Sequence, residues 1–333
     1  MSLKIINVMD ATSNEWDTFW NSSTSATYYH SRQWAEIWQL YSNGIIKPEP
    51  KKVAFSDGVS VLLPFSKQSY YGGIIKRYSL AGPPAMALPY YGNWLTYDLL
   101  TEEHVSLLTN YILNNFRNLV WRLNPYDSNS GKIIASSKYA VRNSLVTYMI
   151  DLTKGEDYIL SNMNQSCRNQ VKQGIRNKLT VTEGEDINDW EKYYNIYRDT
   201  LKRWGSKTIY MLDWKIFHIL FHAKDSRIKL WLVWHNEIVI AGGICFYSQG
   251  KIISWHIASL TEYHKLRPIN FLKYMIIKDG INKNYHWFDF ETAGGKKGLR
   301  RFKKSFGPEE KMCDMIIKWH PVIYYTKKIF DSK

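Results

Sequence analysis

Cysteine is scarce in this chain of 333 residues. The three cysteines, Cys167, Cys245 and Cys313, lie far apart and fit no paired spacing. This pattern argues against a disulfide framework and against a cysteine-rich zinc site, and it is typical of proteins of the reducing cytosol. We therefore expect a cytoplasmic protein.

Long apolar runs are also missing. The longest, "IVIAGGICFY" from Ile238, is about half of the roughly 20 residues that a membrane-spanning helix needs, and it predicts a buried strand. The N-terminus "MSLKIINVMDATSNEW" lacks the apolar run of a signal peptide. The sequence predicts no transmembrane segment, although the protein could still work peripherally at the inner face of a membrane.

Acidic residues are outnumbered by basic ones. The chain has 30 Asp and Glu against 44 Lys and Arg, which gives a formal charge of +14. That surplus favours an anionic partner, such as a nucleic acid, a nucleotide-linked substrate or an acidic membrane face. Aromatic residues, in contrast, are plentiful, and such side chains both fill cores and line clefts that bind sugars, bases or apolar ligands.

Several familiar catalytic motifs are absent. There is no phosphate-binding P-loop and no Ser-His-Asp pattern around a nucleophile elbow, so no covalent intermediate is expected. His218 and His222 are four residues apart on an expected helix, but they lack a third ligand and the His-Glu-x-x-His form. We predict no metal site.

Hydrophobic periodicity and turn residues divide the second half of the chain into strands and helices. The expected order is β-α-α-β-β-β-α-β-α-β, and the first half repeats it loosely. The simplest explanation is an α+β protein made of two copies of one unit, residues 1–150 and residues 151–333. The elements expected in the second half are strands at 179–185, 230–234, 238–247, 251–260, 286–290 and 312–319, and helices at 189–202, 213–223, from Pro268 and from Gly298.

Four segments carry a resemblance to a known family. They are "YYHSRQWAEIW", "CRNQVKQGIRNKLTV", "KLRPINFLKYMIIKDGINKNYHWFDF" and "GLRRFKKSFGP", and the last is the most specific. In these segments and in the order of its elements, the chain resembles the Fem-type aminoacyltransferases of the GNAT acyltransferase superfamily. The resemblance implies two tandem GNAT-like domains with mixed central sheets flanked by helices. It implies a degenerate N-terminal domain and a catalytic C-terminal domain.

The same resemblance implies an activity. Members of the family transfer an amino acid from aminoacyl-tRNA to an amine of a peptidoglycan precursor, and relatives in the wider superfamily use acyl-CoA. We therefore expect an acyltransferase that transfers an aminoacyl group from aminoacyl-tRNA to an amine of a cell-envelope or peptidoglycan-type precursor. Apart from the donor substrate, aminoacyl-tRNA or acyl-CoA, no cofactor is expected. The alternatives are an acyl-CoA-dependent N-acyltransferase of surface-polysaccharide synthesis and a non-catalytic protein that binds RNA or anionic lipid.

Two departures from the family pattern bear on the substrates. The acetyl-CoA loop of ordinary GNAT enzymes would lie between Leu260 and Ile269, but "TEYHKLRP" contains no glycine-rich cradle for a pyrophosphate. This absence counts against acetyl-CoA. Glu36 stands about where a peptidoglycan-specific relative would have a lysine for a nucleotide-sugar acceptor, which questions that acceptor.

The most specific segment contains the leading catalytic candidate. Leu299, Phe302 and Phe306 recur at helical spacing, so one face of a short helix is expected to pack inward with Lys303 at its rim. The resemblance gives the lysine of the family's Phe-Lys pair, here Lys303, the role of stabilising the tetrahedral oxyanion of acyl transfer. Phe302 is a candidate substrate contact. The alternative is a solvated basic face.

Other basic residues are candidates for holding phosphates. Arg168, Lys172 and Arg176 recur every four residues and form a stripe along one expected helix. The stripe is either a phosphate rail or an exposed helix face. By the resemblance, Arg203 contacts the phosphates of the acceptor and Tyr210 lines the cleft; the alternative for this loop is a structural role.

The remaining candidates lie on or near the strands that line the expected cleft. His256 is a candidate general base because the ordinary pKa of histidine is near neutrality, although a structural histidine is the alternative. Strand alternation separates His256 from Trp255, so only one of the two can face the cleft. Glu291 could orient an ammonium group or pair with Lys303. Asn270 is a further candidate substrate contact.

Overall fold

The computed structural model describes residues 2–70, 73–83, 90–135, 141–204 and 211–319. The chain divides into two compact units, Met1–Leu145 with Met312–Lys333, and Val146–Lys311. Within the described residues, no helix is both long enough and apolar enough to cross a membrane.

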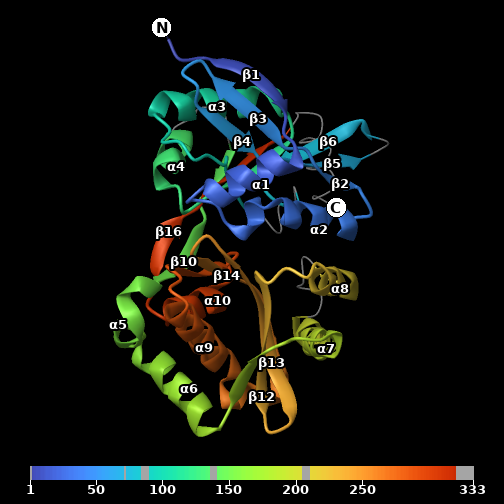
Figure 1. Cartoon of the computed structure of the whole chain (residues 1–333). Helices are drawn as coiled ribbons and strands as arrows, with labels where there is room; N and C mark the ends of the chain where they lie inside the picture. The colour runs from blue at the N-terminus through green and yellow to red at the C-terminus, as the bar shows by residue number, and fades with distance from the viewer. Residues whose placement is uncertain (1, 71–72, 84–89, 136–140, 205–210, 320–333) are drawn as a thin grey trace. The chain divides into compact units, whose positions relative to one another are not determined.

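The second unit is built on one mixed sheet of seven strands (Figure 1). Three of them form an antiparallel meander, as the turn residues predict, and the third pairs in parallel with the next strand of the chain. In spatial order the strands are β11 (Thr180–Glu183), β12 (Ile228–His235), β13 (Ile238–Ser248), β14 (Lys251–Ser259), β15 (Trp287–Thr292), β10 (Val146–Asp151) and β16 (Glu309–Met312).

Helices cover both faces of this sheet (Figure 1). On one face lie α5 (Gly155–Asn162), α6 (Gln165–Arg176) and α9 (Pro268–Asn282); on the other lie α7 (Ile187–Trp204) and α8 (Trp214–His222). Two 3₁₀ helices, Leu152–Lys154 and Thr261–Leu266, precede α5 and α9, and α10 (Lys297–Lys304) follows β15. Pro268 begins α9, where its missing N–H costs no helical hydrogen bond.

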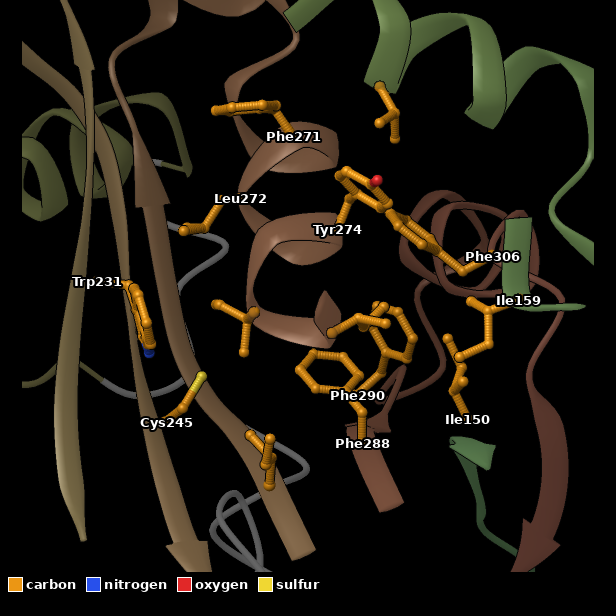
Figure 2. Packing of buried hydrophobic residues seen from close by; sticks show 14 of the residues in the cluster. Ile150, Ile159, Trp231, Cys245, Phe271, Leu272, Tyr274, Phe288, Phe290 and Phe306 are labelled. Carbon is orange, nitrogen blue, oxygen red and sulfur yellow. The ribbon is translucent and has the colours of Figure 1, made fainter. Parts of the chain in front are cut away.

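The core of the second unit lies between the sheet and α9. Phe288 and Phe290 alternate on β15, so both point to the same face and meet Leu272 of α9 and Cys245 of β13 in one buried cluster (Figure 2). Gly174 allows α6 to approach α9 closely, because a Cβ there would stand 2.7 Å from the Cβ of Phe271. The sheet and the helices over it therefore pack closely around the parallel pair β14–β15.

The first unit contains two sheets. One has the order β1 (Ile5–Asp10), β3 (Lys51–Phe55) and β4 (Ser60–Leu63). The other has the order β2 (Ile46–Pro48), β5 (Ser66–Tyr70), β6 (Ile75–Ser79), β8 (Leu119–Leu123), β17 (Met315–Lys318) and β9 (Val141–Asn143), and β7 (Tyr91–Gly92) pairs with β8. The helices are α1 (Ser13–Ser22), 3₁₀ helix Tyr28–His30, α2 (Arg32–Tyr41), α3 (Glu102–Asn115) and α4 (Ser128–Ala135).

The C-terminal strand corrects the expected domain limits. Residues 312–319, expected as one strand of the second unit, form the end of β16 and, after a break, β17. β17 pairs with β8 and β9 of the first unit, where Met315 and Ile317 pack on Val120. A register read from apolar residues alone does not reveal which of two sheets a strand joins. The division near residue 150 lies between Leu145 and Val146 in the structure.

Candidate functional site

The parallel strands β14 and β15 separate partway along their length. Their pairs are Lys251 with Trp287, Ile252 with Phe288 and Ile253 with Asp289, and the ladder ends there. Beyond that point β14 stays with β13, while β15 stays with β10, so the two strands splay apart from Ser254 and Phe290 onward. A splay leaves strand edges and the side chains between them open to a ligand, and we take it as the candidate active site.

A β-bulge lies on β14 just beyond the splay point. His256 pairs with Ile244 and Ser254 pairs with Cys245, so Trp255 has no opposite residue on β13. The expected separation of Trp255 and His256 by strand alternation is therefore wrong. Their ring centroids lie 5.6 Å apart, because the extra residue in a bulge interrupts the two-residue period.

Lys303, the leading candidate from the sequence, is held at the other side of the splay. Its side chain is buried, and Nζ donates hydrogen bonds to the backbone carbonyls of Phe290 (2.5 Å), Glu291 (2.9 Å) and Thr292 (2.7 Å). Glu291 has a left-handed φ of 61°, a backbone state that breaks regular strand geometry at this point. An ammonium group has three N–H donors, and here all three serve the end of β15.

This arrangement refines the sequence interpretation of the segment. Lys303 is not part of a solvated basic face, because only 6% of its surface is exposed. Phe306 is fully buried and Phe302 packs on it with ring centroids 5.4 Å apart, whereas Leu299 is exposed. The expectation that all three apolar residues pack inward is thus wrong for Leu299, because α10 begins at Lys297 and its first turn faces solvent.

The carboxylates near this end of β15 support its backbone. Asp289 is fully buried and accepts hydrogen bonds from the Thr147 hydroxyl (2.6 Å) and from the backbone N–H of Glu291 (2.7 Å). Glu291 itself is partly exposed. Asp289 therefore ties β15 to β10 where β15 leaves β14.

Lys273 of α9 is a residue that the sequence reasoning missed. Its side chain is buried, and Nζ donates a hydrogen bond to the Ser254 hydroxyl on β14. Nζ also lies 5.5 Å from the ring centroid of Phe288 and 5.7 Å from that of Phe290, both on β15. Burial lowers the pKa of Lys273 to about 8. Its spacing four residues from Ile269 and from Ile277, within an apolar stripe, is the signal that could have found it.

His256 does not have the properties of a general base. Its Nδ1 lies 2.5 Å from the Tyr193 hydroxyl, and the rings of Tyr193, Tyr197 and Phe217 surround it. Burial lowers the pKa of His256 to about 3, so the ring is neutral near pH 7 and binds an added proton weakly. The structure therefore favours the structural alternative for this histidine.

The expected basic stripe divides into two parts. Arg168 folds back on the end of α5, where Nη1 donates to the carbonyls of Leu160 (3.2 Å), Ser161 (2.9 Å) and Met163. Although Arg168 is partly exposed, it therefore closes the α5–α6 corner. Lys172 and Arg176 are exposed on α6. These two remain available to an anionic ligand.

The other candidates lie apart from the splay point or outside the described chain. Arg203 donates to Thr261 Oγ1 (2.9 Å) and lies 3.0 Å from His264 Nε2, beside the 3₁₀ helix before α9. Asn270 is buried and contacts Cys167 Sγ at 3.7 Å, which ties α9 to α6. Tyr210 lies outside the described residues.

The part of the chain that the structure describes contains no set of ligands for a metal ion. No group of three or more metal-binding side chains occurs there. His218 and His222 stack with ring centroids 4.0 Å apart, and His222 Nδ1 lies 2.9 Å from the His218 carbonyl. A separate pocket of about 40 Å³, lined by residues of β10, α5 and the Phe306–Gly307 turn, holds little more than a water molecule.

Comparison with known proteins finds a family match for the part of the chain that contains this site. Residues 161–304 match the family described as "Acetyltransferase (GNAT) domain". This part of the chain is therefore similar to GNAT acetyltransferase domains. The matched residues include β14, β15, α9 and α10, which together carry Ser254, Lys273 and Lys303. No curated protein matches the sequence significantly.

Solved structures show the same fold over nearly the whole chain. The structure of FemX has a TM-score of 0.71 at 14% identity, covering 96% of this chain and 99% of that chain. The structure of L-PGS from Bacillus licheniformis has a TM-score of 0.56 at 11% identity, covering 95% and 94%. The C-terminal domain of a putative lysylphosphatidylglycerol synthetase from Agrobacterium fabrum has 0.52 at 12%, covering 77% and 81%. The expected fold of two tandem GNAT-like units is confirmed.

Proposed function

We propose that this acyltransferase transfers an aminoacyl group from aminoacyl-tRNA to an amine of a cell-envelope or peptidoglycan-type precursor. The observation that carries this proposal is the splay between β14 and β15, flanked by the buried amines of Lys273 and Lys303. Acyl transfer needs an aligned carbonyl and a positive field where negative charge develops on its oxygen. The fold shared with FemX supports the choice of reaction class.

The segment before α9 supports tRNA rather than acyl-CoA as donor. Where a CoA-dependent enzyme would have a glycine-rich loop, this chain has the 3₁₀ helix Thr261–Leu266 followed by Arg267 in the left-handed region (φ 62°). This segment contains no glycine, so side chains occupy the space that a pyrophosphate cradle needs. The ester of a charged tRNA requires no such cradle.

Lys303 supplies the positive field in this proposal. Its three donors are engaged with carbonyls of β15, so it acts on the developing oxyanion through space, in a setting with little water to screen its charge. Lys172 and Arg176 on α6, and Arg203 beside the 3₁₀ helix, hold phosphates of the donor or the acceptor. An acidic precursor at the inner membrane face fits the formal charge of +14.

The surroundings of Glu36 are the reason why the proposal names a class of acceptor, the amines of envelope precursors, and no single acceptor. The carboxylate of Glu36 pairs with Arg32 at 2.5 Å, and Arg32 also donates two hydrogen bonds to the carboxylate of Asp17. The carboxylate is therefore neutralised within the first unit. A nucleotide-sugar acceptor would have to be bound there without the lysine that a peptidoglycan-specific relative would have.

The test is a transfer assay on the pure protein. Charged tRNAs with radiolabelled amino acids, and separately an acyl-CoA panel, are incubated with amine-bearing nucleotide-sugar peptides and amine-bearing lipids. The proposal predicts amine-dependent loss of label from tRNA and gain of label in one acceptor. Use of CoA thioesters with no use of charged tRNA would favour the polysaccharide N-acyltransferase, and binding of RNA or lipid without any transfer would favour the non-catalytic alternative.

A further inference from the structure

Lys273 touches both strands at the point where they separate. Its hydrogen-bond partner Ser254 is the first residue of β14 beyond the last β14–β15 pair. The two aromatic rings beneath its ammonium group, Phe288 and Phe290, lie on β15 to either side of Asp289 in that same pair. A side chain from the helix that joins the two strands thus lies directly under the origin of the splay.

This lysine lacks the partners that usually accompany a buried cation. Among the described residues no carboxylate lies within ion-pair distance of Nζ, and the Ser254 hydroxyl is its hydrogen-bond partner. Two of the three N–H groups of the charged form therefore have no acceptor in that part of the chain. A buried ammonium group with so few partners is unfavourable for folding, so its presence at this position calls for another explanation.

The hydrogen bonds of Lys303 differ from those of Lys273, and this difference indicates which of the two lysines can accept a proton. The three donors of Lys303 are all bound to the backbone of β15, so it cannot accept or release a proton without breaking that support. Within the described chain, Lys273 has a single hydrogen-bond partner, the Ser254 hydroxyl, which can both accept and donate a proton and also contacts the Cys245 thiol. His256, the candidate base from the sequence, already faces Tyr193.

We propose that Lys273, acting through the Ser254 hydroxyl, accepts the proton that the attacking ammonium group of the acceptor must lose. This inference rests on the acyltransferase function proposed above and adds to it the base that the sequence did not identify. The substrate class that it requires is a primary amine, which is protonated near pH 7 before it binds. Lys273 is a positioning and proton-accepting residue, and Ser254 is the group that meets the substrate.

Protons and bonds balance in the proposed reaction. The ammonium proton passes to Ser254 Oγ while the Ser254 hydroxyl proton passes to the neutral amine of Lys273. The free amine of the acceptor attacks the carbonyl carbon, the new C–N bond forms, and the ester bond to the tRNA 3′-end or 2′-end oxygen breaks. The second amine proton goes to that leaving oxygen. Lys273 returns its proton to solvent after the products leave.

The groups around Lys273 are compatible with a base that works near neutral pH. Burial lowers the pKa of Lys273 to about 8, and the charge of Glu291 on β15 raises it in part. Burial raises the pKa of the Cys245 thiol to about 11, so that thiol stays protonated. Asp289 on β15 is directed to Thr147 on β10, and Lys303 of α10 is bound to β15. A lysine tuned close to the working pH is an effective general base.

Lys251 provides a matched control on the same strand. It is buried, burial lowers its pKa to about 8, and its Nζ donates to the Gln249 carbonyl at 2.9 Å. It lies at the paired end of β14, opposite Trp287, away from the splay. Lys251→Met therefore removes a buried lysine of the same kind without removing the proposed base.

The experiment measures turnover against pH for the full-length wild type and for Lys273→Met, Ser254→Ala and Lys251→Met, using the charged tRNA and amine that the wild type accepts. The wild type should gain activity with rising pH and level off above a midpoint near 8. In Lys273→Met, the rise of activity with pH should disappear and turnover should fall roughly 100-fold, with KM little changed. Ser254→Ala should behave similarly. Lys251→Met should keep both the rise and the rate.

A second measurement tests the proton-accepting role of Lys273 in the wild type, so it does not depend on whether a variant folds correctly. In protein labelled with ¹³C at the lysine ε carbon, the resonance missing from Lys273→Met should titrate near pH 8 in the wild type. An ordinary titration near pH 10.5, or a Lys273→Met enzyme with the wild-type rate and pH profile, overturns the inference and leaves the transferase proposal intact. A wild type that transfers from no donor overturns the proposed function and the inference with it.

Discussion

The two ends of the β14–β15 pair present different surroundings to the same helix. At the paired end, Gly280 of α9 sits against Ile252, so tightly that a Cβ would stand 2.6 Å from the Ile252 Cδ1. At the splayed end, two turns earlier on α9, the side chain is Lys273 and its partner is a hydroxyl. Close apolar packing holds the strands together at one end, and polar groups occupy the opening at the other. The closely packed end fixes the positions of the two strands, so the opening at the other end does not depend on a bound ligand.

The largest effect should come from Lys303→Met. Turnover should fall about 100-fold, because the positive field at the carbonyl is lost. The free energy of unfolding should also fall by about 3 kcal/mol, because three carbonyls at the end of β15 lose their donor. Single-turnover kinetics and urea unfolding measure the two effects.

The neighbouring Lys304→Met is the control for that change. Lys304 is more exposed and pairs with Glu310, so its removal should alter stability by less than about 1 kcal/mol. Near-normal turnover in a folded Lys303→Met protein would show that the field of Lys303 has no part in the reaction.

Lys273→Met should have the opposite effect on stability. The difference between the ordinary lysine pKa of 10.5 and a pKa of about 8 corresponds to about 3 kcal/mol of unfavourable free energy at pH 7. Met removes the buried charge and keeps much of the volume, so the variant should unfold at higher temperature than the wild type. Calorimetry at pH 7 measures the shift.

The pH dependence of that stabilisation follows from proton binding. Between about pH 8 and about pH 10.5 the unfolded chain holds a proton on residue 273 that the folded chain has released, so wild-type stability rises with pH across this window. The advantage of Lys273→Met is complete below pH 8 and should vanish near pH 10.5. A constant difference at all pH values would mean that burial does not disfavour the charged form.

At the paired end, Gly280→Ala should cost about 1 kcal/mol, because the added methyl meets the ends of the Ile252 and Leu152 side chains, which must shift. The midpoint of the pH–rate profile should stay where it is, since the splay and its polar groups are not touched. A shifted midpoint would show that the apolar end and the polar end of the strand pair are coupled.

The smallest effect should come from the exposed stripe. Replacing Lys172 and Arg176 by Ala removes two charges from the surface of α6 and should raise KM for the anionic substrate several-fold, with little change in kcat. The slope of log KM against log salt should decrease by about two, one for each phosphate that no longer has a cationic partner. The same slope in both proteins would exclude the phosphate role of these residues.

Local signals predicted much of this fold because they reflect local physics. The turns after β12 and β13, the proline at the start of α9 and the alternation of Phe288 and Phe290 each fix backbone geometry within a few residues. The resemblance of its segment to a specific family motif also singled out Lys303, which was expected at the rim of a buried face. Its three carbonyl partners were not expected, since they lie at the end of β15, where Glu291 adopts a left-handed φ that no local pattern predicted.

Other features depended on interactions that no short segment encodes. The bulge at Trp255 arises from the pairing of β14 with β13, and it reversed the expected relation between Trp255 and His256. β17 joins the first unit because its apolar residues complete a cluster with Val120, nearly 200 residues earlier in the chain. Arg168 looked like part of a surface stripe, yet it serves the end of the preceding helix.

The sequence by itself determined an α+β chain with a surplus of positive charge, and its resemblance to a known family indicated two GNAT-like units and singled out Lys303 near the end of the second. Only the tertiary structure decided which buried lysine, Lys273 or Lys303, has N–H groups without a hydrogen-bond acceptor among the described residues. Periodicity reports which side chains are buried, but the protonation and the free hydrogen-bonding capacity of a buried amine depend on the groups that distant strands bring within a few ångströms of it.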